Sequence, residues 1–148
     1  MEAGGTLRRS GPVASFVDTN VVVYCHDHGS EEKRRVAVAL LSDPPDRLVI
    51  STQVLSEFYW TVTRKLRPPL PDSAAAEATR HLAALPLVTI DGEIILSAID
   101  TAQHHQLALW DAMIVEAAVR SGCDRLLTED LTDGQEIRGI LIANPFAA

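Results

Sequence analysis

Short apolar runs alternate with longer amphipathic stretches along most of this chain. The runs at 15–17, 47–51, 86–90, 125–128 and 140–143 have the length and the branched side chains of buried strands. Strands that alternate with helices are typical of a parallel sheet covered on both faces. We therefore expect a three-layer α/β/α fold with a central parallel sheet of four to five strands. The run at 140–143 is predicted at the edge of that sheet.

The stretches between these runs repeat apolar residues with the period of a helix. The predicted helices are 20–26, 31–41, 52–67, 72–85, one that follows a cap at Asp91, and 109–121. The helix after Asp91 is expected to turn Ile95, Ala98, Ile99 and Ala102 towards the core. The stretch 109–121 is apolar almost all round, which predicts a buried helix.

Length and composition indicate one globular domain. The 148 residues are enough for a proper core, and we expect a loose N-terminal arm at 1–12 followed by a single domain at 13–148. The net charge of −7 argues against a broad basic surface for long duplex DNA. Two distant cysteines, no apolar run of membrane-spanning length and no signal-like segment predict a cytoplasmic protein without a membrane partner.

Acidic residues recur where strands end. Asp18 follows the first predicted strand and Asp130 the fourth, while Glu57 lies in the first turns after the second. Asp111 is near the start of a buried helix, on the face that carries Ile114. Because the carboxyl ends of parallel strands share one edge of a sheet, we expect these acids to converge there.

A cluster of this kind predicts metal chemistry. Taken singly, Asp111 could simply favour a helix N-terminus, Glu57 could be an ordinary helical glutamate, and Asp130 could be a loop acid. Together they are carboxylates that repel one another and call for divalent cations. Oxygen ligands of this type fit Mg²⁺ or Mn²⁺, which activate water for hydrolysis of a phosphodiester.

Four motifs in order give the chain a specific resemblance. They are FVDTNVVVY, ISTQVLSEFYW, LWDAMIVEAA and GCDRLLTEDLTDGQ, and together they extend nearly from Phe16 to Gln135. The chain resembles PIN-domain proteins, and more narrowly the VapC-type toxins of VapBC toxin–antitoxin systems. The segment 1–12 is outside the pattern of that family.

The resemblance implies both an activity and a site. By position, the acidic metal site of the family, which is also its catalytic set, falls on Asp18, Glu57, Asp111 and Asp130, with Thr128 beside the last acid and Thr19 or Asn20 supporting the first. It implies a Mg²⁺- or Mn²⁺-dependent endoribonuclease that cleaves RNA with metal-activated water and inhibits growth. It also implies a homodimer that is neutralised by a VapB-type antitoxin.

Two alternatives compete with this interpretation. A non-catalytic RNA- or protein-binding module on the PIN scaffold would be expected to lack one of the acids, and none is missing. A receiver-like phosphoacceptor would need a lysine after a late strand, and no lysine follows Lys65.

The remaining functional-looking side chains have ordinary explanations. Trp60 and Trp110 are predicted to fill the core or a dimer interface, and the basic groups at 33–35 and 64–67 to be solvated helix faces that become phosphate contacts if RNA binds. Either Glu129 or Asp130 could be the fourth acid. If the extended backbone persists past Thr128, Thr128 and Asp130 point to one side and Glu129 to the other.

Overall fold

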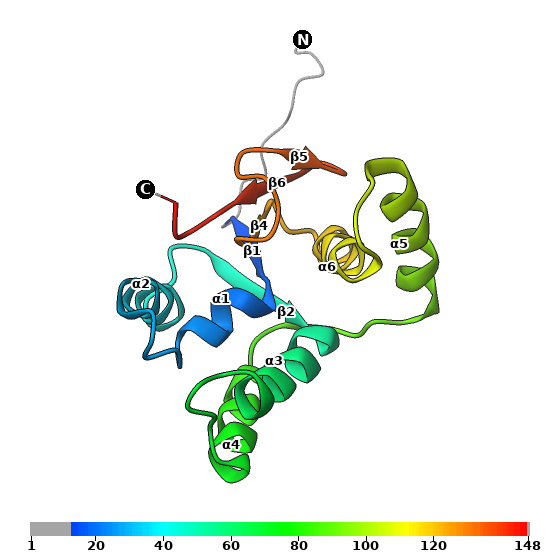
Figure 1. Ribbon diagram of the computed structural model, residues 1–148. Coiled ribbons are helices and arrows are strands. Elements are labelled where there is room, and N and C mark those ends of the chain that lie inside the picture. The colour runs from blue at the N-terminus through cyan, green and yellow to red at the C-terminus, as the bar shows by residue number, and fades with distance from the viewer. Residues whose placement is uncertain (1–12, 148) are drawn as a thin grey trace.

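A computed structural model describes residues 13–147, and a central sheet organises them (Figure 1). Within this range the sheet has six strands in the order β3-β2-β1-β4-β6-β5. The strands are β1 (Ala14–Val17), β2 (Arg47–Ser51), β3 (Leu87–Val88), β4 (Arg125–Leu127), β5 (Glu136–Ile137) and β6 (Ile140–Ala143). Neighbouring strands are parallel except in the β5–β6 hairpin. The predicted α/β fold with a central parallel sheet is confirmed, although the sheet has six strands in place of four to five and one of them is antiparallel. The predicted arm at 1–12 lies outside the described residues.

Helices cover both faces of the sheet. They are α1 (Thr19–Tyr24), α2 (Glu31–Ser42), α3 (Thr52–Arg64), α4 (Asp72–Leu82), α5 (Gly92–His105) and α6 (Leu109–Arg120). Figure 1 shows α1 to α4 on one side of the sheet and α5 and α6 on the other. None of the helices between residues 13 and 147 is long and apolar enough to cross a membrane.

The strand β1 lies between β2 and β4 in the sheet, and every one of its side chains is buried. Phe16 pairs with Val49 of β2 on one side and with Leu126 of β4 on the other, and all three are buried. The helix α6 packs on this core with seven consecutive buried residues, from Ala112 to Ala118, as its apolar sequence predicted.

Several predictions need correction. The strand at 140–143 exists but is not at the edge, because the short antiparallel β5 covers it. The run at 86–90 forms only the two-residue β3, and α3 ends at Arg64. The buried face of α5 is made by Ile94, Ala98 and Thr101, whereas Ile95 and Ile99 are exposed. The sequence pattern of α5 fits either face, and packing against α6 selects one.

A buried acid on α6 ties three elements together. Glu116, only 4% exposed, accepts hydrogen bonds from Thr101 of α5 at 2.6 Å and from Arg138 at 2.9 and 3.1 Å. Arg138 and Gly139 form the turn between β5 and β6, with φ of 55° and 80°. Positive φ is unfavourable for arginine, so the ion pair to Glu116 stabilises the turn that makes β5.

Burial alone would raise the pKa of Glu116, but the bonds from Arg138 and Thr101 hold it below its ordinary value. Arg138→Met should therefore lower the free energy of unfolding at pH 7 by about 1–3 kcal/mol, the cost of a buried acid without its partner. The deficit should shrink as pH falls below 4.5, the ordinary glutamate pKa, because a protonated Glu116 no longer needs the cation. Urea unfolding of wild type and variant at pH 7 and at a pH below 4.5 measures the change in this deficit.

The matched control is Glu116→Gln combined with Arg138→Met, which leaves no buried charge and should recover part of the loss. A double variant no more stable than Arg138→Met alone would show that Arg138 stabilises the hairpin by packing and not through Glu116.

Candidate active site

The point where the chain changes direction across the sheet lies at the carboxyl end of β1. The chain runs from β1 to β2 on one side and later returns to place β4 on the other. Ligands of open parallel sheets bind at such a switch point. Asp18 is the first residue after β1, and its backbone N–H extends the ladder by donating to Leu127 O at 3.0 Å.

The Asp18 side chain is buried, 6% exposed, and both of its oxygens accept hydrogen bonds. Its Oδ1 accepts from the Thr19 backbone N–H at 2.7 Å, which caps the start of α1. Its Oδ2 accepts from the Thr128 hydroxyl at 2.8 Å and from Asn20 Nδ2 at 3.3 Å. These bonds fix the orientation of the carboxylate at the mouth of the sheet.

Asn20 joins the first acid to the last. Its side-chain nitrogen also lies 3.2 Å from Thr128 Oγ1 and donates to Asp130 Oδ2 at 3.0 Å. The Thr128 hydroxyl was predicted to lie beside the Asp130 carboxylate. Instead it donates to Asp18 and accepts from the Asp130 backbone N–H at 3.1 Å, because β4 ends at Leu127 and the chain turns there. Asn20 is the residue that contacts the Asp130 carboxylate.

Glu129 faces a different environment from Asp130. It accepts from the Tyr24 hydroxyl at 2.5 Å and forms an ion pair with Lys33 at 2.9 Å. Burial would raise the pKa of Glu129, but these two donors keep it below its ordinary value. The two candidates for the fourth acid are thus separated, with Asp130 towards Asp18 and Glu129 neutralised by a cation.

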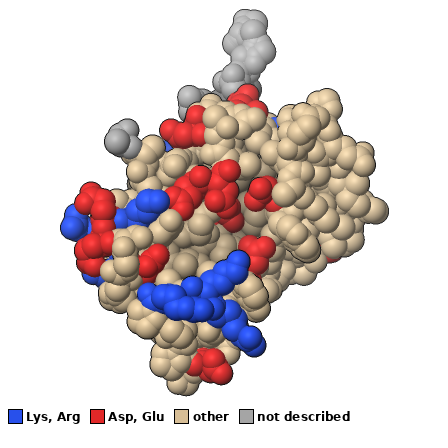
Figure 2. All heavy atoms as spheres, viewed as in Figure 1, with Lys and Arg blue, Asp and Glu red and all other residues tan. Residues whose placement is uncertain are grey.

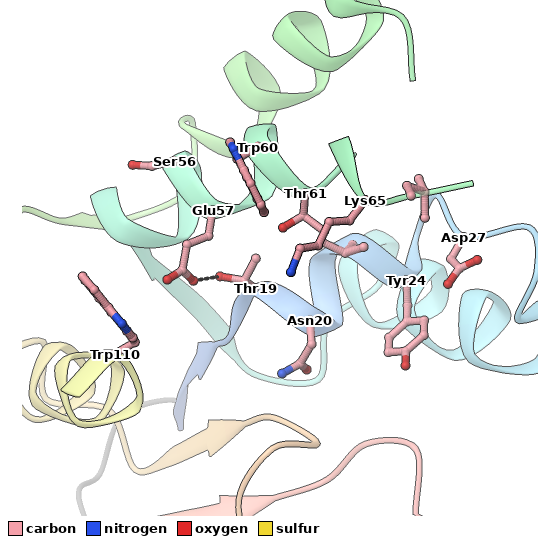
Figure 3. Close-up of a pocket in the computed structure, with 12 residues that line it drawn as sticks. Thr19, Asn20, Tyr24, Asp27, Ser56, Glu57, Trp60, Thr61, Lys65 and Trp110 are labelled. Atoms are coloured by element: carbon pink, nitrogen blue, oxygen red, sulfur yellow. Dashed lines mark hydrogen bonds between the residues drawn. The ribbon is translucent and has the colours of Figure 1, made fainter. Parts of the chain in front are cut away.

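Glu57 of α3 is held from both sides. Its Oε1 accepts from the Thr19 hydroxyl at 2.7 Å (Figure 3), and its Oε2 accepts from Gln53 Nε2 at 3.0 Å. The same Gln53 nitrogen donates to the Trp110 carbonyl at 3.1 Å, next to Asp111. Gln53 was not singled out from the sequence, although its position one helical turn before Glu57 was a usable signal.

Asp111 interacts electrostatically with two of the other acids, Asp130 and Glu57. Burial raises the pKa of Asp111, and the charges of Asp130 and Glu57 raise it further. Burial also raises the pKa of Asp18, to about 7, with the same two acids adding to the shift and the bonds from Thr128 and Thr19 opposing it. The structure therefore brings Asp18, Glu57, Asp111 and Asp130 within electrostatic reach of one another.

The donor chemistry of these four residues fits a hard divalent cation. Within residues 13–147 none of them forms an ion pair with a basic side chain. No three His, Cys, Asp or Glu side chains in that range form a ready-made metal-binding group. Mg²⁺ is commonly held by one or two carboxylates and several waters, so it does not require such a group.

A groove of about 1090 Å³ leads away from the acids between α1 and α3. Thr19, Asn20 and Glu57 line one part of it, and Trp60, Lys65 and Trp110 are also on its walls. Figure 2 shows acidic side chains around a hollow in the centre of this face and a band of Lys and Arg along the lower rim. The site thus combines an acidic floor with a basic and aromatic border.

The sequence from residue 15 to residue 132 matches the model of the PIN domain family. That range contains all four acids. A comparison with curated proteins gave no significant match.

Solved structures with the same fold include bacterial toxins. VapC20 of Mycobacterium tuberculosis, a sarcin-ricin loop cleaving toxin, is 20% identical with a TM-score of 0.64, over 78% of this chain and 91% of that one. A toxin–antitoxin complex from Klebsiella pneumoniae is 21% identical with a TM-score of 0.67, over 88% and 97%. The DNA-bound VapBC of Salmonella typhimurium is 18% identical with a TM-score of 0.63, over 90% and 98%.

The raised pKa of Asp18 has a consequence for the metal-free protein. The folded chain binds a proton at Asp18 more tightly than the unfolded chain does, so this stabilisation is present at low pH and is lost as pH rises towards about 7. The Asp18→Asn variant cannot titrate at this position. Its stability relative to wild type, measured by urea unfolding in EDTA, should therefore rise by roughly 2–3 kcal/mol from pH 5 to pH 8.

Subtracting wild type from variant at each pH cancels the other titrating groups. A difference that stays constant across this range would mean that Asp18 is ionised in the folded protein already at pH 5.

Proposed function

The chain belongs to the PIN domain family, and from that premise we propose that it is a VapC-type toxin, a metal-dependent endoribonuclease that cleaves RNA by hydrolysis. The observation that carries the proposal is the convergence of four carboxylates at the switch point of the sheet, none of which pairs with a basic side chain within residues 13–147. Repulsion among these carboxylates does not stabilise the fold, whereas a bound divalent cation would offset it.

Asp18 and Asp111 are the proposed principal ligands of Mg²⁺ or Mn²⁺, and Glu57 and Asp130 complete or tune the site. The ion, when bound, activates water for attack on phosphorus and balances charge on the phosphate. The chain itself orients the donors: Thr128 and the start of α1 hold Asp18, Thr19 and Gln53 hold Glu57, and Asn20 holds Asp130. Such supporting bonds are needed because ligands that rotate freely bind metals weakly.

Two partners follow from the same proposal. Several proteins of the same fold form toxin–antitoxin complexes, and a basic side chain of a VapB-type antitoxin entering the acidic groove would neutralise the carboxylates that RNA cleavage needs. The proposed homodimer is supported by three apolar side chains that are exposed on α5, Ile95, Leu96 and Ile99, because a second copy would bury them. The proposed location is the cytoplasm, where RNA is available.

The alternative of a non-catalytic binding module on the same scaffold is not favoured. Such a module has no need for side chains that fix the orientation of each acid, yet Asp18, Glu57 and Asp130 each accept a side-chain hydrogen bond.

Cleavage of RNA in Mg²⁺ or Mn²⁺ should leave 5′-phosphate and 3′-hydroxyl ends, because attack by water does not use the 2′-hydroxyl. EDTA should abolish the reaction, and Asp18→Asn should abolish it in either metal. Sequencing of RNA ends after brief induction, with the Asp18→Asn variant as control, measures both the target and the chemistry. Ends that carry a 2′,3′-cyclic phosphate would contradict the mechanism.

The separate environments of Asp130 and Glu129 give a second prediction. Asp130→Ala should lower kcat at least tenfold, the low end of what the loss of a group at a metal site costs. Glu129→Ala should change kcat less, because Glu129 is already bound to Lys33 and Tyr24. Asp133→Ala serves as the control for removal of a nearby acid and should also have a smaller effect. If Glu129→Ala loses as much activity and Asp130→Ala keeps it, the fourth acid is Glu129.

A further inference from the structure

The chain has two tryptophans, and both line the groove, together with one of the four acids, Glu57. Trp60 comes from α3 and Trp110 from the first turn of α6, two elements that are distant in sequence. In Figure 3 the two indoles lie on either side of Glu57, the acid that is bonded to Thr19. An aromatic surface is therefore present on each side of this acid.

Of the two roles predicted from the sequence, in the core or at a dimer interface, neither indole has the first. Trp60 is 52% exposed and Trp110 is 62% exposed, whereas buried Phe16 and Phe58 supply the large aromatic side chains of the core. Two indoles exposed on the walls of one groove, unlike apolar side chains scattered singly over a surface, point to a ligand. A ligand with flat apolar groups would cover the faces of these indoles.

The charges around the groove favour a polyanion. Lys65 Nζ lies 5.2 Å from the ring centroid of Trp60, so a cation accompanies one of the indoles on the groove wall. The basic band in Figure 2 lies beside the acidic hollow. Phosphates would contact this band while the acids, with their cation, would receive the phosphate to be cleaved.

We propose that Trp60 and Trp110 are stacking platforms for two bases of single-stranded RNA, one on each side of the phosphate that is cleaved. The inference rests on the proposed nuclease function and adds the form of its substrate. Bases in a duplex are stacked on their neighbours and cannot lie on an indole, so the substrate is unpaired where it is cut. Stacking tolerates any base, because every base has a π-face.

A pair of substitutions, one in the protein and one in the RNA, tests this contact. An oligonucleotide that the protein cleaves is made with an abasic nucleotide immediately 5′ or immediately 3′ of the cleaved bond. With wild type, each abasic substitution should raise KM at least fivefold, the loss expected for one base–aromatic stack. Trp60→Ala should raise KM for the intact oligonucleotide by a similar factor and make one of the two abasic substitutions harmless. Trp110→Ala should do the same for the other.

Controls separate stacking from folding. Trp60→Phe and Trp110→Phe keep an aromatic face and should retain most of the affinity. Leu141→Ala removes another exposed apolar side chain, 43% exposed on β6 and outside the groove, and should leave KM unchanged. Because the chain has no other tryptophan, rapid mixing with the intact oligonucleotide should quench its emission before product forms.

The outcomes distinguish the two levels of the proposal. If wild type cleaves RNA but the alanine variants keep their KM, or lose affinity equally for intact and abasic RNA, the stacking proposal is wrong and the nuclease function stands. Alanine variants that cleave normally but fail to bind the antitoxin or a second copy would reassign the indoles to a protein interface. A wild-type protein that cleaves no RNA in Mg²⁺ or Mn²⁺ would remove the function itself.

Discussion

The candidate site depends on one carboxylate that the fold keeps from water. Asp18 follows a completely buried strand, so its side chain enters the protein at the mouth of the sheet with 6% of its surface exposed. Burial raises its pKa to about 7 even though three groups donate hydrogen bonds to it. In the metal-free protein the ionised form of Asp18 is therefore disfavoured, and a bound divalent cation would stabilise it.

The residues around Asp18 divide the nearby acids into two kinds. Tyr24 and Lys33 satisfy Glu129, whereas the Asp130 carboxylate accepts a hydrogen bond from the neutral side chain of Asn20. Asn20 comes from α1 and Thr128 from the end of β4, so the site is assembled across the junction of β1 and β4. Within residues 13–147 this arrangement keeps basic side chains from pairing with the four acids and places Lys and Arg around the site instead.

Much of the fold follows from local patterns. The strands β1, β2, β4 and β6 and the helices α2 and α6 lie close to their predicted positions, because uniformly apolar runs and capped amphipathic runs fit few other structures. Predictions failed where local pattern was ambiguous. The apolar residues of α5 fit two faces, and only packing on α6 buries Ile94 in place of Ile95. The edge strand β5 has two residues, too few for a pattern, and depends on the distant pair Glu116–Arg138.

The sequence by itself determined the fold class and the family and placed the candidate acids at or near strand ends, because motif order and strand-end positions are local properties of the chain. The tertiary structure alone decided which neighbour each acid has. It set Glu129 against Lys33, linked Asn20 to Asp130, and made Gln53 a bridge between Glu57 and the start of α6. It also placed Trp60 and Trp110 in the groove instead of the core. These contacts join segments up to 110 residues apart, and local periodicity carries no information about which distant side chains will meet.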